Sequence, residues 1–178
     1  MALSELLKIV TPPDKPKEVP AKPNWAAVEK KLGLQLPDDY KRYVAKFGSG
    51  VLGDFVHVYN PFSRDEYTCL QKRVEKVCGM QRHFRETEDH PVPYDVYPES
   101  PGLLPWGQDD NGNYLFWLTR GARNKWPVVV CSGRDSRYQL FEMGMTAFLA
   151  RTFTGEVKCK IWPKPFAITS RRAKFEPY

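Results

Sequence analysis

Residues 103–117 read LLPWGQDDNGNYLFW, and this stretch decides the fold. Asn111-Gly112 is a strong short-range hairpin signal, because both residues tolerate the positive φ angles of a type I′ turn. The apolar and aromatic residues on either side favour extended backbone. The stretch therefore predicts two antiparallel strands joined by a tight turn.

The aromatic residues of the second strand fall on both of its faces. Tyr114 and Phe116 share one face, and Leu115 and Trp117 share the other, because successive side chains of a strand point in opposite directions. A sheet with helices on one side only would leave some of these rings exposed, as protein-binding surfaces often do. The alternative is that the C-terminal segment folds back and covers them.

Helical and strand patterns continue on both sides of the hairpin. The predicted helices cover residues 25–32, 38–47, 63–85 and 146–154, and the other predicted strands cover residues 54–59, 126–131 and 138–142. Short connections between consecutive strands imply antiparallel pairing. We therefore predict an α+β fold, with an antiparallel sheet of about four to six strands and helices packed mainly on one side.

The boundaries of these helices rest on capping signals. Asn24 is a good N-cap for the first helix, and Gly33 ends it. Residues 63–66 (Ser-Arg-Asp-Glu) have the S-x-x-E pattern of a capping box, and Phe62 and Tyr67 are placed as a hydrophobic staple. This pattern predicts that the longest helix begins at the capping box.

The chain divides into three segments. Residues 1–23 hold a short amphipathic helix, which could dock on the domain or on a partner, and a proline-rich linker; residues 24–155 form the α+β domain. Residues 156–178 form a basic extension with six Lys/Arg and two Glu, a net +4 of the +6 carried by the whole chain. The positive charge therefore belongs mainly to the tail and does not indicate a basic face on the domain.

Composition bears on location and redox state. No run approaches the ~18–20 apolar residues of a membrane span, and the N-terminus does not resemble a signal peptide. The four cysteines are far apart and form no C-x-x-C pair, which favours reduced thiols over a disulfide framework. We expect a cytoplasmic protein that does not bind membranes.

Residues 48–53 (GSGVLG) match the dinucleotide-binding pattern G-x-G-x-x-G letter by letter. That motif needs a strand before it and a helix after it, so that the phosphate meets a helix N-terminus. Here a helix precedes and a strand follows. The glycines are therefore interpreted as a helix stop and a tight turn, and no cofactor is expected.

The histidines and cysteines do not form a recognisable reactive or metal-binding motif. His57 lies in a predicted strand, His83 near a helix end and His90 in a proline-rich loop, and no serine sits in a G-x-S-x-G motif. The spacing of Cys69 and Cys78 relative to these histidines is not a known zinc pattern. We expect no catalytic residue, no metal site and no enzymatic activity.

Asp109 and Asp110 directly precede the predicted turn. Paired carboxylates can serve acid–base chemistry or bind a cation. They can also stabilise the turn, or form an exposed acidic edge that contacts a partner. The last interpretation, together with the density of aromatic residues, gives a hypothetical protein-binding set: Trp106, Gln108, Asp109, Asp110 and Tyr114, with Asp54 and His57 nearby if the strand order allows.

The ordered set of motifs resembles the SUKH superfamily, which contains bacterial immunity proteins and fungal cell-wall assembly regulators. The matching segments are Trp25 to Gly33, Leu36-Pro37-Asp38-Asp39-Tyr40-Lys41, Phe47 to Gly50, residues 104–117, and the closing helix with Phe148-Leu149 and Gly155. The resemblance covers residues 24–155. It implies an α+β fold without catalytic residues.

The resemblance also implies a role. Many bacterial members bind and block a polymorphic toxin, often a nuclease. The near-neutral domain and basic tail differ from the acidic immunity proteins that face nucleases, so the target stays open. We expect a protein partner, a polymorphic toxin domain, and a monomer or weak homodimer. The alternative is a nucleic-acid-binding or regulatory module that acts through the basic tail, although its charge density is modest.

Overall fold

One sheet organises the chain. The computed structural model describes residues 2–87, 92–135, 137–164 and 174–178. Its strands are β1 (Gly50–Leu52), β2 (Val56–Val58), β3 (Asp95–Val96), β4 (Gly102–Asp109), β5 (Tyr114–Leu118), β6 (Val128–Cys131), β7 (Tyr138–Phe141) and β8 (Phe175–Pro177). They lie in the order β7-β6-β5-β4-β2-β1-β8, and β3 pairs with β4. All pairs are antiparallel except β3 with β4.

The predicted α+β class and antiparallel sheet are confirmed, but the strands are more numerous than predicted. The described part of the chain holds eight, because short segments outside the predicted strands also pair: β1 and β8 at one edge and β3 beside β4. The expected hairpin is present as β4 and β5.

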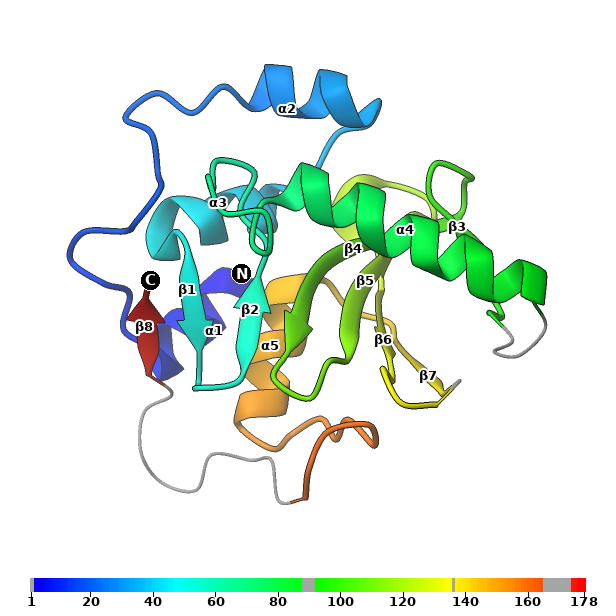
Figure 1. Cartoon of the computed structure of the whole chain (residues 1–178). Coiled ribbons are helices and arrows are strands. Elements are labelled where there is room, and N and C mark those ends of the chain that lie inside the picture. Colours follow the sequence, from blue (N-terminus) through cyan, green and yellow to red (C-terminus); the bar gives the residue numbers. More distant parts are fainter. Residues whose placement is uncertain (1, 88–91, 136, 165–173) are drawn as a thin grey trace.

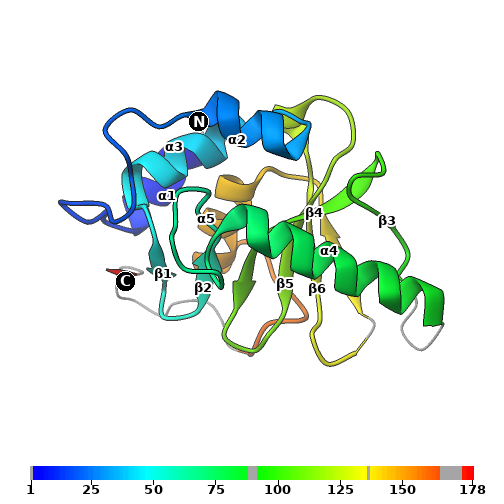
Figure 2. The ribbon, with the colours of Figure 1, turned by 45° about the horizontal axis from the view of Figure 1, so that its top comes forward.

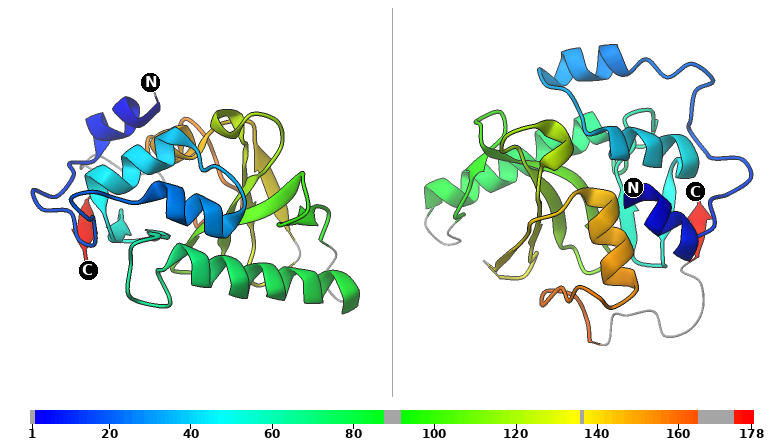
Figure 3. Two further views of the ribbon diagram at one scale, coloured as in Figure 1. Left: turned by 90° about the horizontal axis from the view of Figure 1, so that it is seen from above. Right: turned by 180° about the vertical axis from the view of Figure 1, so that it is seen from behind.

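Helices cover both faces of this sheet. They are α1 (Ala2–Ile9), α2 (Trp25–Leu32), α3 (Asp38–Phe47), α4 (Leu70–Thr87) and α5 (Met145–Phe153), with a 3₁₀ turn at Arg123–Lys125. As seen from behind in Figure 3, α1 and α5 lie in front of the sheet and α4 lies beyond it. Three helices (α1, α3 and α5) thus share one face, as predicted, and α4 covers part of the other (Figure 1).

Three of the predicted helix boundaries follow their capping residues. The Asn24 side chain accepts a hydrogen bond from the Ala27 N–H, and Gly33 ends α2 in the left-handed conformation. Gly48 ends α3 at a φ of 67°. The GSGVLG segment is therefore a helix stop followed by a turn into the sheet, as the sequence indicated.

The start of α4 was predicted wrongly. The helix begins at Leu70, and residues 63–69 form a loop. The Ser63 hydroxyl accepts from the Asp65 N–H at 3.1 Å, and the Asp65 carboxylate accepts from the Tyr67 N–H at 2.6 Å. These side chains therefore stabilise successive turns instead of capping a helix.

The expected staple is absent for the same reason. Tyr67 is 60% exposed, and Phe62 packs on Trp25 with ring centroids 5.0 Å apart. The backbone of Asn60 joins the two ends of this loop. Its N–H donates to the Thr68 C=O, and its C=O accepts from the Leu70 N–H.

The turn between β4 and β5 also differs from the prediction. Gly112 has a φ of 78°, whereas Asn111 does not have a positive φ, so this is not a type I′ turn. The Gly112 N–H donates to the Asp109 C=O, and the Asp109 N–H donates to the Asn113 C=O, which gives a longer loop. The predicted hairpin is confirmed. Its turn is held by the Asp109 side chain, which accepts hydrogen bonds from within the loop.

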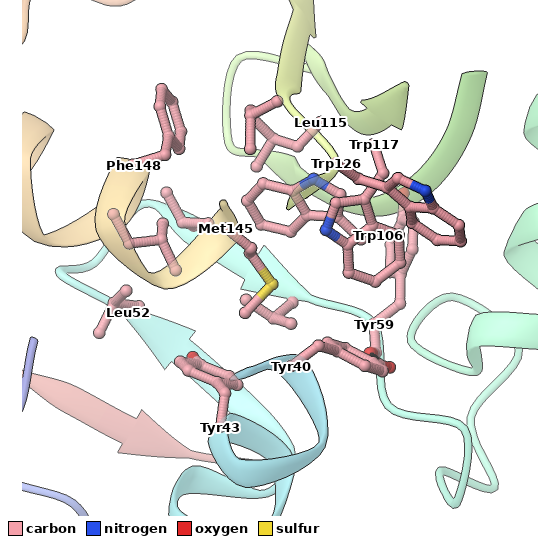
Figure 4. Packing of buried hydrophobic residues seen from close by; sticks show 14 of the residues in the cluster. Tyr40, Tyr43, Leu52, Tyr59, Trp106, Leu115, Trp117, Trp126, Met145 and Phe148 are labelled. Carbon is pink, nitrogen blue, oxygen red and sulfur yellow. Dashed lines mark hydrogen bonds between the residues drawn. The ribbon is translucent and has the colours of Figure 1, made fainter. Parts of the chain in front are cut away.

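Strand alternation places Leu115 and Trp117 on one face and Phe116 on the other, as predicted, and each face builds an apolar core. Leu115 and Trp117 join the core under α3 and α5, and Phe116 joins a second core with Val77 of α4. Trp106 lies inside the first core, fully buried, with its ring centroid 6.1 Å from that of Trp117 (Figure 4).

Both ends of the chain pack on this scaffold. Leu6 of α1 is fully buried, and α1 contacts α5, so the N-terminal helix docks on its own domain. Trp162 is 2% exposed and packs on Phe148. Part of the C-terminal segment therefore does fold back over the core rings.

Strand β8 completes one edge of the sheet by pairing with β1. Gly50 permits this approach, because a Cβ atom there would lie 2.4 Å from the Glu176 carbonyl oxygen. The Phe175 ring packs on Phe47 at 5.2 Å between centroids. Figure 2 shows the C-terminus beside β1, at the end of the sheet opposite β7.

The remaining compositional predictions are partly tested. All four cysteines are free and buried, so their predicted reduced state stays a prediction that this arrangement permits. Among the described residues, no helix combines the length and apolar character that a bilayer span would need.

Candidate partner-binding surface

One half of the sheet face that carries α4 has no helix over it. Figure 1 shows α4 crossing β4, β5 and β6, whereas β1, β2 and β8 carry no helix on that side. Strand register aligns one residue from each of five strands across this half: Glu176, Val51, His57, Gln108 and Tyr114. We call this row and its immediate neighbours the open face.

The same row continues under α4, where it is closed. Tyr114 pairs with Cys131, and Cys131 pairs with Tyr138. The Tyr138 hydroxyl donates to Gln81 of α4 at 2.8 Å. The open face therefore ends where α4 begins to supply partners for the row.

His57 ties the hairpin to the C-terminus at the centre of the open face. Its Nε2 lies 2.6 Å from Asp110 Oδ1, and its Nδ1 is hydrogen-bonded to the Tyr178 hydroxyl. Burial, followed by the negative charges of Asp110 and Asp65, raises the pKa of Tyr178 to about 12. The phenol thus stays protonated at neutral pH, and the arrangement holds no activated nucleophile.

A second polar cluster lies where the open face meets α4. Gln108 Oε1 accepts from the Tyr59 hydroxyl at 3.1 Å and from Arg73 Nη2 at 2.9 Å. The Arg73 guanidinium also stacks on the Tyr59 ring at 5.3 Å. Burial raises the pKa of Tyr59 to about 12, although the nearby Arg73 charge acts in the opposite direction.

Two tyrosines are the exposed large hydrophobic residues of the described chain. Tyr67 is 60% exposed and Tyr178 is 52% exposed. Together with Lys17, Glu18, Asp65 and Thr68 they line a hollow of about 410 Å³. Aromatic rings with polar tips beside such a hollow are typical of protein-binding surfaces.

The predicted site residues divide into two groups. Gln108, Asp110, Tyr114 and His57 lie together on the open face. Asp54 is exposed in the β1–β2 turn, one residue before Phe55, whose C=O accepts from the Asp110 N–H.

Two predicted residues do not belong to the surface. Trp106 has no exposed area, because β4 directs it into the core. Asp109 is 2% exposed, and its carboxylate accepts hydrogen bonds from the backbone N–H groups of Asn111 and Asn113. Of the alternatives raised for Asp109, turn stabilisation is the one the structure shows.

Three residues that lie on the open face or at its border were not identified from the sequence. Tyr178 comes to the open face only because β8 pairs with β1, and Tyr67 was assigned to a helix that begins three residues later. Arg73 had a visible signal, since it occupies an inward position of α4 between Leu70 and Val77. A charged residue within an apolar stripe is unusual enough to single out.

Other candidates lie elsewhere or outside the described residues. His83 is exposed near the end of α4, away from the open-face row. His90, Phe166, Arg171 and Arg172 fall in residues that the structure does not describe. Within the described ranges no cluster of His, Cys, Asp and Glu is arranged to hold a metal ion.

Comparisons with known proteins give a family. No curated protein and no solved structure matches the chain. A family profile described as SUKH_6, SMI1-KNR4 cell-wall, matches residues 22–172. This range includes β1 to β7 and therefore most of the open face. Because the match covers most of the chain, the protein belongs to the SUKH superfamily, in its SMI1-KNR4 branch.

Proposed function

We propose that this chain is a non-enzymatic protein-binding domain, and specifically an immunity protein that binds and neutralises a cognate toxin. The open face carries this proposal. It presents polar and aromatic side chains on five adjacent strands without a covering helix. Membership of the SUKH superfamily is consistent with an immunity role.

The physical character of the open face supports binding of a macromolecule. The strands fix the side chains, so little conformational entropy is lost when a partner binds. Tyr67, Tyr114 and Tyr178 supply rigid contact area at low entropic cost, and Asp110 and Gln108 supply directional hydrogen bonds.

The chemistry of the open face also favours binding over catalysis. The His57–Asp110 pair lies on the surface, where Asp110 is half exposed. The Tyr178 phenol that is hydrogen-bonded to His57 has a raised pKa. Nucleophilic catalysis by this phenol would require it to lose its proton at the working pH, which the raised pKa of Tyr178 opposes. A sheet face occludes a toxin's active surface by shape and charge, without a reactive group.

Co-expression tests the proposal. The chain is produced together with the product of each neighbouring gene in turn, and co-purification and growth are measured. We expect a stable complex and restored growth. Asp110→Lys should weaken the complex, because it removes the contact with His57 at the centre of the open face and places a longer side chain there.

A matched control separates the open face from general charge effects. Glu142→Lys also replaces an exposed acid by lysine, directly after the edge strand β7, and should leave binding unchanged. Equal binding by Asp110→Lys and the native chain would contradict the open face as the contact surface. Failure of every neighbouring gene product to bind would contradict the immunity role.

The alternative, nucleic-acid binding through the tail, has one observation in its favour. Lys158, Lys160 and Lys164 are all exposed. However, Trp162 and Phe175 pack into the fold and are not free to stack on bases. Deleting residues 157–178 would remove core contacts, so the three lysines should be replaced by glutamate. Salt-sensitive oligonucleotide binding that this variant lacks would favour the alternative.

A further inference from the structure

Arg73 is a buried cation without a carboxylate. Its side chain lies on the inward side of α4, and the residue is 6% exposed. No described Asp or Glu oxygen lies within 4.0 Å of its guanidinium, although nine such ion pairs occur elsewhere in the described residues. Its visible partners are Gln108 Oε1 and the Tyr59 ring.

This environment is unfavourable for a guanidinium. A buried charge loses its hydration and normally regains it through an opposite charge and a full set of hydrogen bonds. Arg73 Nη2 has one acceptor, and Nε is enclosed without any acceptor. The fold alone therefore gives no reason for an arginine where the neighbouring inward residues, Leu70 and Val74, are apolar.

The cluster lies at the border of the open face, because Gln108 belongs to the open-face row and accepts from Arg73. Arg73 Nη1 is not an enclosed atom, and the neighbours of the guanidinium, Gln108 and Tyr59, are uncharged. Gln108 Oε1 already accepts two hydrogen bonds, from Tyr59 and from Arg73, which fixes the amide and leaves its NH₂ group as the free end. Tyr114 pairs with Gln108 across the hairpin and borders the same place.

We propose that Arg73 and Gln108 form a receptor for the carboxylate of an Asp or Glu side chain supplied by the partner protein. A carboxylate is planar, accepts two parallel hydrogen bonds and would neutralise the buried charge. The inference rests on the proposed function, since it describes how the same open face recognises its partner.

The chain's own nearby acids do not serve this role. Asp110 is paired with His57, and Asp65 accepts from the Tyr67 N–H. Neither forms an ion pair with Arg73. The acid that completes the cluster must therefore come from outside the described fold.

The receptor can be tested without the partner. Propionate is titrated into the full-length ¹⁵N-labelled chain, and the Arg73 Nε–H and Gln108 side-chain amide resonances are followed. We expect saturable shifts with a dissociation constant of about 1–100 mM, as a single small carboxylate can provide. Propionamide, which has the same shape and no charge, should cause no saturable shift. Equal responses to the two compounds, or none to propionate, would overturn the proposal.

Arg73→Met provides a second test. This substitution removes an unpaired buried charge and keeps a similar volume. The midpoint of unfolding in guanidinium chloride, measured on the free chain, should therefore stay unchanged or rise. The substitution should also weaken the complex with the partner by about tenfold or more. Lys72→Met removes the same charge from the adjacent exposed position and should change neither quantity. A lower midpoint for Arg73→Met would show a structural role and overturn the proposal.

The two proposals fail in different ways. Partner binding that Arg73→Met leaves intact would refute the receptor and leave the binding function standing. A propionate response in the absence of any binding gene product would refute the immunity role and not the carboxylate site.

Discussion

Replacing Asp109 by alanine tests which side chain holds the β4–β5 hairpin together. Oδ1 accepts from the backbone N–H groups of Asn111 and Asn113, both at 3.0 Å, and Oδ2 accepts from Asn113 Nδ2 at 2.8 Å. Asn111 is exposed, so water can replace its lost acceptor. Asn113 is 4% exposed, so its two donors would be left unsatisfied at about 1–3 kcal/mol each.

Relief of a buried negative charge offsets part of this loss. We therefore expect Asp109→Ala to lower the free energy of unfolding by about 2–4 kcal/mol. Guanidinium unfolding, followed by the fluorescence of the buried tryptophans, should show a lower midpoint with an unchanged slope.

Asp110→Ala is the matched control, because it removes the same side chain one position later. The Asp110 side chain is 52% exposed, and its ion pair with His57 lies at the surface. Such pairs contribute about 0–1 kcal/mol. A destabilisation by Asp109→Ala no larger than that of Asp110→Ala would refute the assignment of the turn to Asp109.

Comparing Asp109→Asn with the native chain tests how stability depends on pH. Burial raises the pKa of Asp109 above its ordinary 3.8, even though hydrogen bonds from Asn113 and Asn111 act in the opposite direction. The folded state thus binds this proton more tightly than the unfolded state. Its contribution to stability is present below pH 3.8 and is lost as the pH rises through the folded pKa. The native chain should therefore lose stability relative to Asp109→Asn as the pH rises above 3.8; a constant difference would show that burial does not dominate.

Three further predictions concern other parts of the fold. Gly50→Ala should displace β8, because the new Cβ atom would lie 2.4 Å from the Glu176 carbonyl oxygen. The Gly53 N–H donates to the C=O of Lys174, the residue before β8, so its hydrogen exchange should become faster. Burial acts to raise the pKa of Glu29, but hydrogen bonds from Lys41 and a backbone N–H outweigh it and lower the pKa. This contribution to stability is present above pH 4.5 and is lost as the pH falls, so Glu29→Gln should destabilise the chain at pH 7 and not at pH 3 in parallel unfolding curves. The four buried thiols should react with a thiol reagent slowly in the native chain and completely in guanidinium; rapid native reaction of any of them would contradict their burial.

Local signals predicted those parts of the fold whose residues have one strong preference. Asn24 and Gly33 mark the ends of α2, because a short polar side chain and a glycine are each suited to their positions. The segment at residues 63–69 could form either a helix start or a series of turns. Contacts of Asn60 with the two ends of this loop decide between them, and those contacts are not visible in local sequence.

The site was predictable to the extent that it lies on the hairpin. Gln108, Asp110 and Tyr114 are close in sequence, and strand alternation indicates their faces. His57 and Tyr178 join them only through the pairing of β2 with β4 and of β8 with β1. Asp109 was misassigned because an acid before a turn can point outward or accept from the turn, and the two forms have the same sequence.

The edges of the sheet explain why the open face is the surface left for a partner. At one edge β8 is three residues long and contains Pro177, which has no N–H to donate to an added strand. At the other edge Gln139 of β7 is occupied, since its side chain donates to the Lys158 C=O at 3.2 Å and accepts from the Lys160 N–H at 2.7 Å.

Strand addition at the β7 edge would therefore meet the segment that holds Lys158 and Lys160, and at the β8 edge it would find a short strand that lacks one main-chain donor. Contact with the open face meets neither obstacle, because its side chains are already fixed by the sheet. Recognition through side chains depends on their charge and shape, whereas strand addition depends on main-chain hydrogen bonds that almost any sequence can form. A protein that must bind one partner and reject others gains specificity from the first arrangement. Edges poorly suited to strand addition and an open face of fixed side chains are thus, within the described residues, the combination that the proposed binding of one toxin would need.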